Sequence, residues 1–141
     1  MKHVQVYCDG GCRPNPGKGA GAALLIFRDI EKEFTVVRKR STNNRMELEA
    51  AILALKKLKT SCSVDLYTDS QYLQRGMTKW IFRWRAKGWH KVKIKNKDLW
   101  IKLDQLSRKH KITWNWIPGH AGIPANLRVD ALVQKKLKKD Y

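Results

Sequence analysis

Long apolar runs and an N-terminal secretion signal are both missing from this sequence. A membrane-spanning helix needs about 20 consecutive, mostly apolar residues, and no stretch of the chain approaches that length. Residues 1–3 lead directly into a strand-like segment, where a signal peptide would have a charged start, an apolar region and a cleavage site. We therefore expect a protein of the cytoplasm.

Cysteine is also scarce, with three residues in 141. Cys8, Cys12 and Cys62 are an odd number, and their spacing lacks the two close pairs, or the paired histidines, of a zinc site. We expect reduced thiols with a structural role in a reducing compartment.

Acidic residues are few: 12 Asp and Glu stand against 30 Lys and Arg, for a formal net charge of +18. So basic a protein favours polyanions, most often nucleic acids; a solubilising surface is the alternative. Residues 75–111 hold 13 Lys and Arg but two acids, together with Trp80, Trp84, Trp89 and Trp100. Flat rings and positive charge suit contacts with bases and phosphates. We expect half of these four rings to pack inside and half to line a groove.

The hydrophobic pattern predicts elements in the order β-β-β-α-β-α-α-α-β-α. Strands are expected over residues 2–7, 22–27, 34–39, 64–67 and 112–117. Helices are expected after an Asn44 N-cap, from Ser70, and over residues 80–87, 98–109 and 126–139. Glycine and proline predict a loop over residues 11–21. This order indicates one α/β domain over residues 1–141, in which three antiparallel hairpin strands and then parallel strands form a five-stranded mixed sheet flanked by helices.

Four acids stand at unusual positions. Asp9 and Asp69 each follow a predicted strand, Glu47 lies near the start of a helix, and Asp130 lies within the last helix. Each has an ordinary explanation: Asp9 as a turn residue, Glu47 as part of a capping box, Asp69 as a helix cap, and Asp130 as a solvated residue. Apolar residues three positions to either side of Asp130 nevertheless point it towards the apolar side of its helix.

Considered together, the four acids predict a metal site. Ligand sites tend to form at the carboxyl ends of strands in an α/β sheet. Gathered carboxylates repel one another unless cations bind among them, and oxygen ligands favour Mg²⁺ or Mn²⁺ over zinc. Two such ions about 4 Å apart can hold the attacking and leaving oxygens of a phosphodiester. Beside a basic, tryptophan-rich surface, this site indicates a nuclease.

Five segments resemble successive blocks of type 1 ribonuclease H, in that family's order, over about residues 4–133. They are YCDGGCRPNPGKGAGAA, STNNRMELEAAILAL, LYTDSQYLQRGMTKWI, RAKGWHKVKIKNKDLW and WNWIPGHAGIPANLRVDALV. The resemblance is to the bacterial-type, free-standing catalytic domain. It implies the ribonuclease H-like fold and a monomeric endonuclease. Such an enzyme hydrolyses the RNA strand of RNA–DNA hybrids with two Mg²⁺ ions, or Mn²⁺ in their place, and leaves 5′-phosphate and 3′-hydroxyl ends.

The resemblance also implies roles for five residues. Asp9 would bridge both metals, and Asp130 would share the metal that activates water. Glu47 and Asp69 would hold the other metal, beside the leaving 3′ oxygen. His120 matches a histidine of a mobile loop that assists proton transfer or product release; surface decoration is the alternative for a lone loop histidine.

Substrate contacts follow from the same resemblance. Four residues match family positions that contact RNA 2′-hydroxyls or bases in the minor groove: Asn15, Asn43, Asn44 and Gln71. The 2′-hydroxyl is the group that distinguishes RNA from DNA. A pocket for a DNA-strand phosphate matches Arg40, Thr42 and Asn96; we refer to these three as the DNA-phosphate pocket. Trp80 matches an aromatic residue of the DNA channel, in a basic protrusion at about residues 80–97. A solvated run of charge is a partial alternative for that protrusion.

One departure from the family pattern is apolar Ala125 and Leu127, where many relatives carry acids; we expect weaker metal attraction or tighter substrate binding. Two other functions are alternatives to a nuclease. A non-catalytic hybrid-binding module is disfavoured because all four carboxylates are present. An integrase-like strand-transfer enzyme is disfavoured because TNNRMEL and GHAG match ribonuclease H far better.

Overall fold

The computed structural model describes residues 1–119 and 121–138. Its elements follow the predicted order of strands and helices. They are β1 (Lys2–Arg13), β2 (Gly17–Phe27), β3 (Ile30–Ser41), α1 (Asn43–Lys56), β4 (Cys62–Thr68), α2 (Gln71–Arg75), α3 (Ile81–Lys87), α4 (Lys97–Ser107), β5 (Lys111–Trp116) and α5 (Pro124–Leu137), with a π-helical turn η1 (Gly76–Trp80) and a 3₁₀ turn η2 (Trp89–Lys91).

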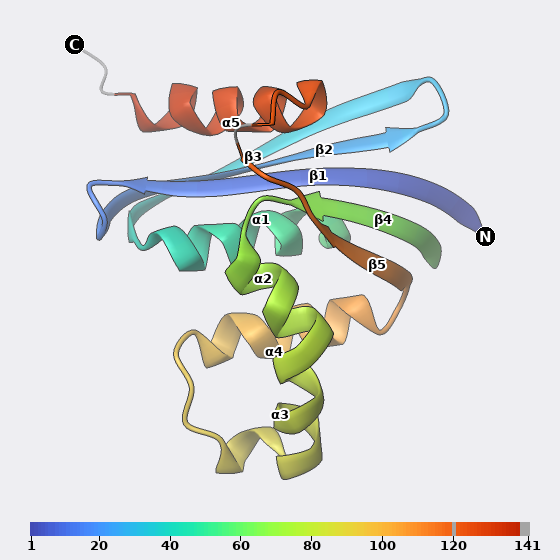
Figure 1. The fold of residues 1–141 in the computed structure, drawn as a ribbon, viewed down its shortest axis with the longest axis vertical. Helices are drawn as coiled ribbons and strands as arrows, with labels where there is room; N and C mark the ends of the chain where they lie inside the picture. Colours follow the sequence, from blue (N-terminus) through green and yellow to red (C-terminus); the bar gives the residue numbers. More distant parts are fainter. Residues whose placement is uncertain (120, 139–141) are drawn as a thin grey trace.

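The five strands form one mixed sheet in the order β3-β2-β1-β4-β5. β1 and β3 each pair antiparallel with β2, whereas β4 runs parallel to both β1 and β5. Figure 1 shows α5 on one face of this sheet, and α1 with the α2–α4 segment on the other. The predicted α/β architecture is therefore confirmed. No helix in the described part of the chain has the length and apolar character needed to cross a membrane.

β2 is buried on both faces and separates two cores. Ala20, Ala22 and Leu24 pack with α5, while Ala23 and Leu25 belong to the core under α1 and α4. Successive side chains of a strand point to opposite faces, so one continuous apolar run serves both layers. Its alanines leave room for helices on either side.

The first four strands are longer than predicted. β1 continues to Arg13, because residues 10–13 pair with β2 from Gly10 opposite Gly21 to Arg13 opposite Lys18. Most of the segment predicted as a loop is therefore a hairpin, and only residues 14–16 form its turn. The prediction was wrong here because ladder hydrogen bonds outweigh the weak strand preference of glycine.

Two helix caps also differ from the predictions. Thr42, not Asn44, caps α1, and its Oγ1 accepts a hydrogen bond from the Arg45 backbone N–H at 3.2 Å. Glu47 is therefore too far into the helix to complete a capping box. Ser70, rather than Asp69, caps α2, and its Oγ accepts from the backbone N–H of Leu73 at 3.1 Å.

Of the four tryptophans in residues 75–111, two pack in the core, as expected, whereas the expectation that the other two line a groove stays a prediction. Trp84 and Trp100 are buried, whereas Trp80 is 37% exposed and Trp89 is partly exposed. The rings of Trp80, Trp84 and Trp100 form one cluster with centroids 5.2–6.5 Å apart. Gly76 permits this packing, since a Cβ there would lie 2.0 Å from the Trp100 ring.

A buried ion pair fastens α3 to α4. Asp104 is 4% exposed, and its carboxylate accepts hydrogen bonds from Arg85 Nε at 2.7 Å and from Arg108 Nε at 3.3 Å. We expect Asp104→Ala to lower the free energy of unfolding by about 3 kcal/mol, because it leaves partly buried Arg85 without a counter-charge. Urea unfolding measures this.

Glu31→Ala is the matched control for Asp104→Ala. It removes a surface partner of Arg128, 2.7 Å away, and exposed ion pairs are weakened by solvent and salt. Equal losses of stability in the two variants would contradict a structural role for the buried pair.

Candidate active site

Three of the four predicted acids converge in space. Asp9 lies in β1, Glu47 in α1, and Asp69 directly after β4. One carboxylate oxygen from each lies within 4.8 Å of the corresponding oxygens of the other two. Asp9 is buried, and the other two side chains are half-buried. We refer to these three residues as the acidic cluster.

Asp9 and Asp69 meet because β1 and β4 are parallel neighbours. Their pairing runs from Lys2 opposite Cys62 to Cys8 opposite Thr68, so each aspartate is the first residue beyond it. Asp9 was predicted to end the first strand. It does not end β1, because β1 continues to Arg13 along β2. It does mark the carboxyl end of the parallel pair, where ligand sites form in such sheets.

Glu47 reaches the acidic cluster because α1 rests directly on β1. The backbone N–H of Gly10 donates a hydrogen bond to Glu47 Oε1. A Cβ atom on Gly10 would lie 2.3 Å from the backbone carbonyl of Met46. Glycine is therefore the residue that allows this close approach of helix and strand.

The end of β5 and the residues that follow it pack against residues 68–69. Trp116 Nε1 donates a hydrogen bond to the Asp69 backbone carbonyl at 3.1 Å, and the Ile117 N–H donates to Thr68 O at 2.9 Å. A Cβ on Gly119 would lie 3.0 Å from Asp69 Oδ2. Sequence reasoning missed the Trp116 contact, because nothing in the pattern of a strand shows what an indole N–H at its end will meet.

Asp130 lies near the acidic cluster but outside it. It is exposed on α5, so the prediction that it faces the apolar side of its helix was wrong. α5 packs through Asn126, Val129, Val133 and Leu137, and Leu127 is 49% exposed. The Asp130 carboxylate is near enough to Asp9 to contribute to its raised pKa, after burial and Asp69.

The electrostatics of the site disfavour unpaired negative charge. Burial raises the pKa of Asp9 from 3.8 to about 8, with further contributions from Asp69 and Asp130. Burial also raises the pKa of Glu47, with Asp9 and Asp69 adding to it, while the Gly10 N–H and the Ser70 hydroxyl oppose the rise. An oxygen-only set of crowded carboxylates with raised pKa values fits hard divalent cations.

Comparison with known proteins agrees with this geometry. The RNase H family model matches residues 1–138. The chain belongs to the RNase H family. Enzymes of this family depend on metal ions and cleave the RNA strand of RNA–DNA hybrids.

This RNase H chain is similar to curated ribonucleases H over most of the length of both chains. It is 52% identical over 135 residues to ribonuclease H of Novosphingobium aromaticivorans, which covers 94% of each chain. It is 48% identical over 135 residues to ribonuclease H of Paramagnetospirillum magneticum, covering 94% of this chain and 88% of the relative. Among solved structures, LC9-RNase H1, a type 1 RNase H with the type 2 active-site motif, matches with a TM-score of 0.88 at 29% identity, over 96% of this chain and 72% of that one.

The predicted substrate residues of this RNase H lie at or near the ends of strands, helices and turns. Asn15, in the β1–β2 turn, accepts a hydrogen bond through Oδ1 from the Asn43 N–H at 3.1 Å, next to the Thr42 cap. Exposed positions hold Arg40, Asn43, Asn44, Gln71 and Trp80. The remaining site residue, His120, falls outside the described residues. Ala125 packs at the edge of the core under α5, and its predicted effect on binding stays a prediction.

Asn96, the third residue of the DNA-phosphate pocket, is held by its neighbours. It adopts a left-handed conformation with φ of 61° just before α4. Its Oδ1 accepts from the Arg45 guanidinium at 3.3 Å, and its Nδ2 donates to the Tyr72 hydroxyl at 3.0 Å. The same hydroxyl accepts from Trp100 Nε1 at 3.1 Å. Tyr72 therefore links the pocket to the core.

We expect Tyr72→Phe to lower the free energy of unfolding by about 2 kcal/mol, because it leaves two donors without an acceptor. It should also weaken hybrid binding severalfold, since Asn96 loses its support. Urea unfolding and a binding titration measure the two effects. Tyr67→Phe is the control: it keeps the ring that stacks on Tyr7 at 4.7 Å and should leave hybrid binding unchanged.

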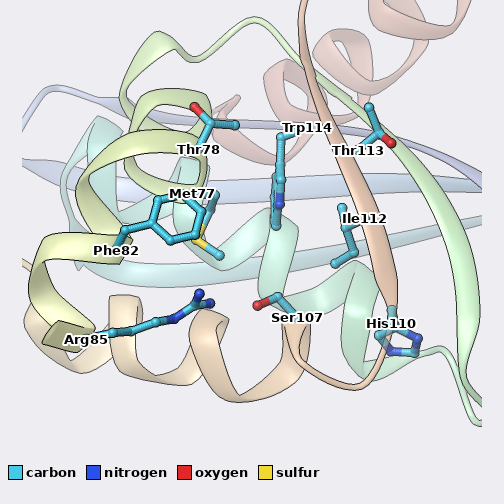
Figure 2. Close-up of a pocket in the computed structure, with 9 residues that line it drawn as sticks. All are labelled: Met77, Thr78, Phe82, Arg85, Ser107, His110, Ile112, Thr113 and Trp114. Carbon is cyan, nitrogen blue, oxygen red and sulfur yellow. The ribbon is translucent and has the colours of Figure 1, made fainter.

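A cavity of about 480 Å³ lies away from the acidic cluster, between η1, α3 and β5. Figure 2 shows Met77, Phe82 and Trp114 facing into it, with Arg85 and His110 at its edges. His110 accepts from the Cys62 N–H through Nδ1 at 3.0 Å, and burial lowers its pKa. No predicted site residue of the described ranges lines this cavity, so it is not the candidate active site.

Proposed function

We propose that this chain is an endonuclease that hydrolyses the RNA strand of RNA–DNA hybrids at the acidic cluster, with Asp130 completing the carboxylate set. The observation that carries the proposal is the convergence of the Asp9, Glu47 and Asp69 carboxylates within 4.8 Å. Membership of the RNase H family supports the substrate.

The carboxylates would hold two Mg²⁺ ions, with Mn²⁺ able to replace them. When bound, such ions supply positive charge to the reacting phosphate and lower the pKa of water. Buried Asp9, between its neighbours, would contact both ions. Glu47 and Asp69 would contact the one beside the leaving oxygen, and Asp130 the other.

The proposed reaction is hydrolysis at phosphorus. A water oxygen forms a bond to the phosphorus atom while the bond from phosphorus to the 3′ oxygen breaks. One proton of the water is released, and the 3′ oxygen gains a proton. The products then carry a 5′-phosphate and a 3′-hydroxyl. His120 is proposed to assist the proton transfer or the release of product.

Substrate recognition is proposed to use both sides of α1. Asn15, Asn43, Asn44 and Gln71 would contact the RNA strand, and the DNA-phosphate pocket and Trp80 the DNA strand. The support is their placement: the Asn15–Asn43 contact lies at the start of α1, and the Arg45 guanidinium joins α1 to Asn96. Residues 80–97 would act as a basic handle within one catalytic domain over residues 1–141. We also propose a cytoplasmic monomer; light scattering after gel filtration tests its mass.

Strand-specific cleavage tests the function. The protein is incubated with end-labelled RNA–DNA hybrid, double-stranded RNA and double-stranded DNA, each with Mg²⁺, Mn²⁺ or EDTA. We expect cleavage of the RNA in the hybrid alone, and only with a metal. Tight binding of the hybrid with no cleavage in either metal would instead indicate a hybrid-binding module. Joining of DNA strands would indicate a strand-transfer enzyme.

A further inference from the structure

A small hollow lies between β3, α1 and α4, on the face of the sheet opposite α5. It has a volume of about 100 Å³ and an apolar floor that includes Leu53 and Leu99. Its charged residues are Arg38 from β3, Glu49 and Lys56 from α1, and Lys102 from α4. Three cations thus surround one acid.

The single acid is engaged by the arginine. Glu49 Oε1 accepts from Arg38 Nε at 2.9 Å and lies 2.8 Å from its terminal nitrogen. Neither Lys56 nor Lys102 has an ion-pair partner among residues 1–119 and 121–138. The two lysines therefore contribute positive charge that Glu49 leaves largely uncompensated.

The two lysines nevertheless line the same hollow, Lys56 from α1 and Lys102 from α4. The neighbouring Lys102 amine is the largest cause of a lowered pKa at Lys56, followed by burial. Long lysine stems lie along apolar surface while their ends stay in water, which fits two lysines that line a hollow with an apolar floor of Leu53 and Leu99. Like charges held together in this way are stabilised by a bound anion.

We propose that Arg38, Lys56 and Lys102 form a second phosphate site, which binds the DNA strand of the hybrid beyond the DNA-phosphate pocket. This inference rests on the proposed function, since it takes the hybrid as the substrate. Ammonium groups bind phosphate oxygens as point charges. A phosphodiester therefore suits a site with two neighbouring amines and a guanidinium.

The second phosphate site is continuous with the DNA-phosphate pocket. Arg38 is two residues before Arg40 on β3, a separation of about 7 Å. Lys102 is six residues after Asn96, a rise of about 9 Å along α4. Because phosphates of one strand recur every few ångströms along a duplex, the second site should meet the same strand within a few phosphates of the first.

Neutralising one phosphate of the DNA strand at a time tests this inference. Each DNA phosphate of a hybrid is replaced in turn by a methylphosphonate, and the dissociation constant is measured in EDTA. With wild type, we expect affinity to fall at two separate places, one for each site. With Lys56→Gln/Lys102→Gln, the second fall should vanish while the first remains.

The salt dependence of binding gives an independent measurement. The loss of one phosphate contact lowers the slope of log affinity against log salt by about 0.9. When salt rises fourfold, the double variant should therefore lose about three- to fourfold less affinity than wild type. Lys135→Gln/Lys136→Gln on α5 removes the same charge from the opposite face and should keep the wild-type slope. The melting temperature of Lys56→Gln/Lys102→Gln should not fall below that of wild type, because removal of the two positive charges relieves the repulsion between them.

The outcomes separate the two proposals. A single fall in the wild-type scan, or a second fall that persists in Lys56→Gln/Lys102→Gln, overturns the second phosphate site but leaves hybrid cleavage intact. If no substitution lowers affinity and the hybrid is not cleaved, both the site and the proposed function fail.

Discussion

Asp9→Asn is expected to reduce hybrid cleavage by about a thousandfold or more while hybrid binding persists. Asparagine keeps the size of the side chain but removes the central negative charge of the acidic cluster. Divalent cations supply several kcal/mol of charge stabilisation to such reactions, and about 1.4 kcal/mol corresponds to a factor of ten in rate. Initial rates on end-labelled hybrid and a binding titration in EDTA measure the two properties.

The same substitution should change how stability depends on pH. The pKa of Asp9 is raised to about 8, by burial first and then by Asp69 and Asp130. Between about pH 4 and pH 8 the unfolded chain has released a proton that the folded protein retains. The stability of the metal-free wild type therefore falls as the pH rises through this range.

Urea unfolding in EDTA at pH 5 and pH 8 measures that effect. Over these three pH units the wild type should lose up to about 4 kcal/mol through Asp9. Asp9→Asn should lose less, because it lacks that proton and keeps only Glu47 with a raised pKa in the acidic cluster. Added Mg²⁺ should restore the wild type at pH 8. Asp65→Asn, an acid of β4 that contacts His3 at 2.9 Å on the sheet surface, is the control for charge loss. Cleavage by Asp9→Asn within tenfold of wild type would contradict the proposed role of the acidic cluster.

The sequence was sufficient to predict the order of elements and the acids, because strand and helix periods and carboxylate chemistry are properties of the side chains. It was insufficient at residues 10–13, where the chain is rich in glycine. Glycine has no side chain to alternate between faces, so β1 shows no pattern there although Gly10 pairs with Gly21. The pairing that extends the strand is made by the backbone of β2.

Packing between elements explains the other differences between prediction and structure, at the start of α1 and at Asp130. Thr42 and Asn44 are both good caps, and the start of α1 at Asn43 allows Arg45 to reach Asp98 at 2.8 Å across to α4. Likewise Asp130 was misplaced because the packing of α5 on β1 and β2 buries Val129 and Val133 but leaves Leu127 in solvent. Such choices depend on partners distant in sequence.

Gly10→Ala should both destabilise the protein and disable its site. A Cβ at this position would lie 2.3 Å from the backbone of Met46 and 2.5 Å from the N atom of Glu47. Backbone atoms of a helix cannot turn aside as the end of a side chain can, so α1 must move away from β1. We expect the free energy of unfolding to fall by more than about 3 kcal/mol, at the upper end of the cost of overpacking.

Movement of α1 also moves Glu47, whose Oε1 accepts the Gly10 N–H. A displacement of about 1 Å in a catalytic arrangement can cost about a hundredfold in rate. We therefore expect Gly10→Ala to cleave hybrid at least a hundredfold more slowly, at a temperature where circular dichroism shows it folded. Its Mg²⁺ requirement should rise, which a rate titration with the metal measures.

The neighbouring glycine gives a matched control. A Cβ on Gly11 would lie 3.3 Å from Val133 Cγ1 and 3.6 Å from Leu137 Cδ1, and both of these are side-chain ends that can shift by a few tenths of an ångström. Gly11→Ala should therefore keep most of the stability and the activity, helped by the lower entropy of its unfolded chain. If Gly10→Ala behaves like Gly11→Ala in both measurements, the close approach of α1 to β1 does not position Glu47.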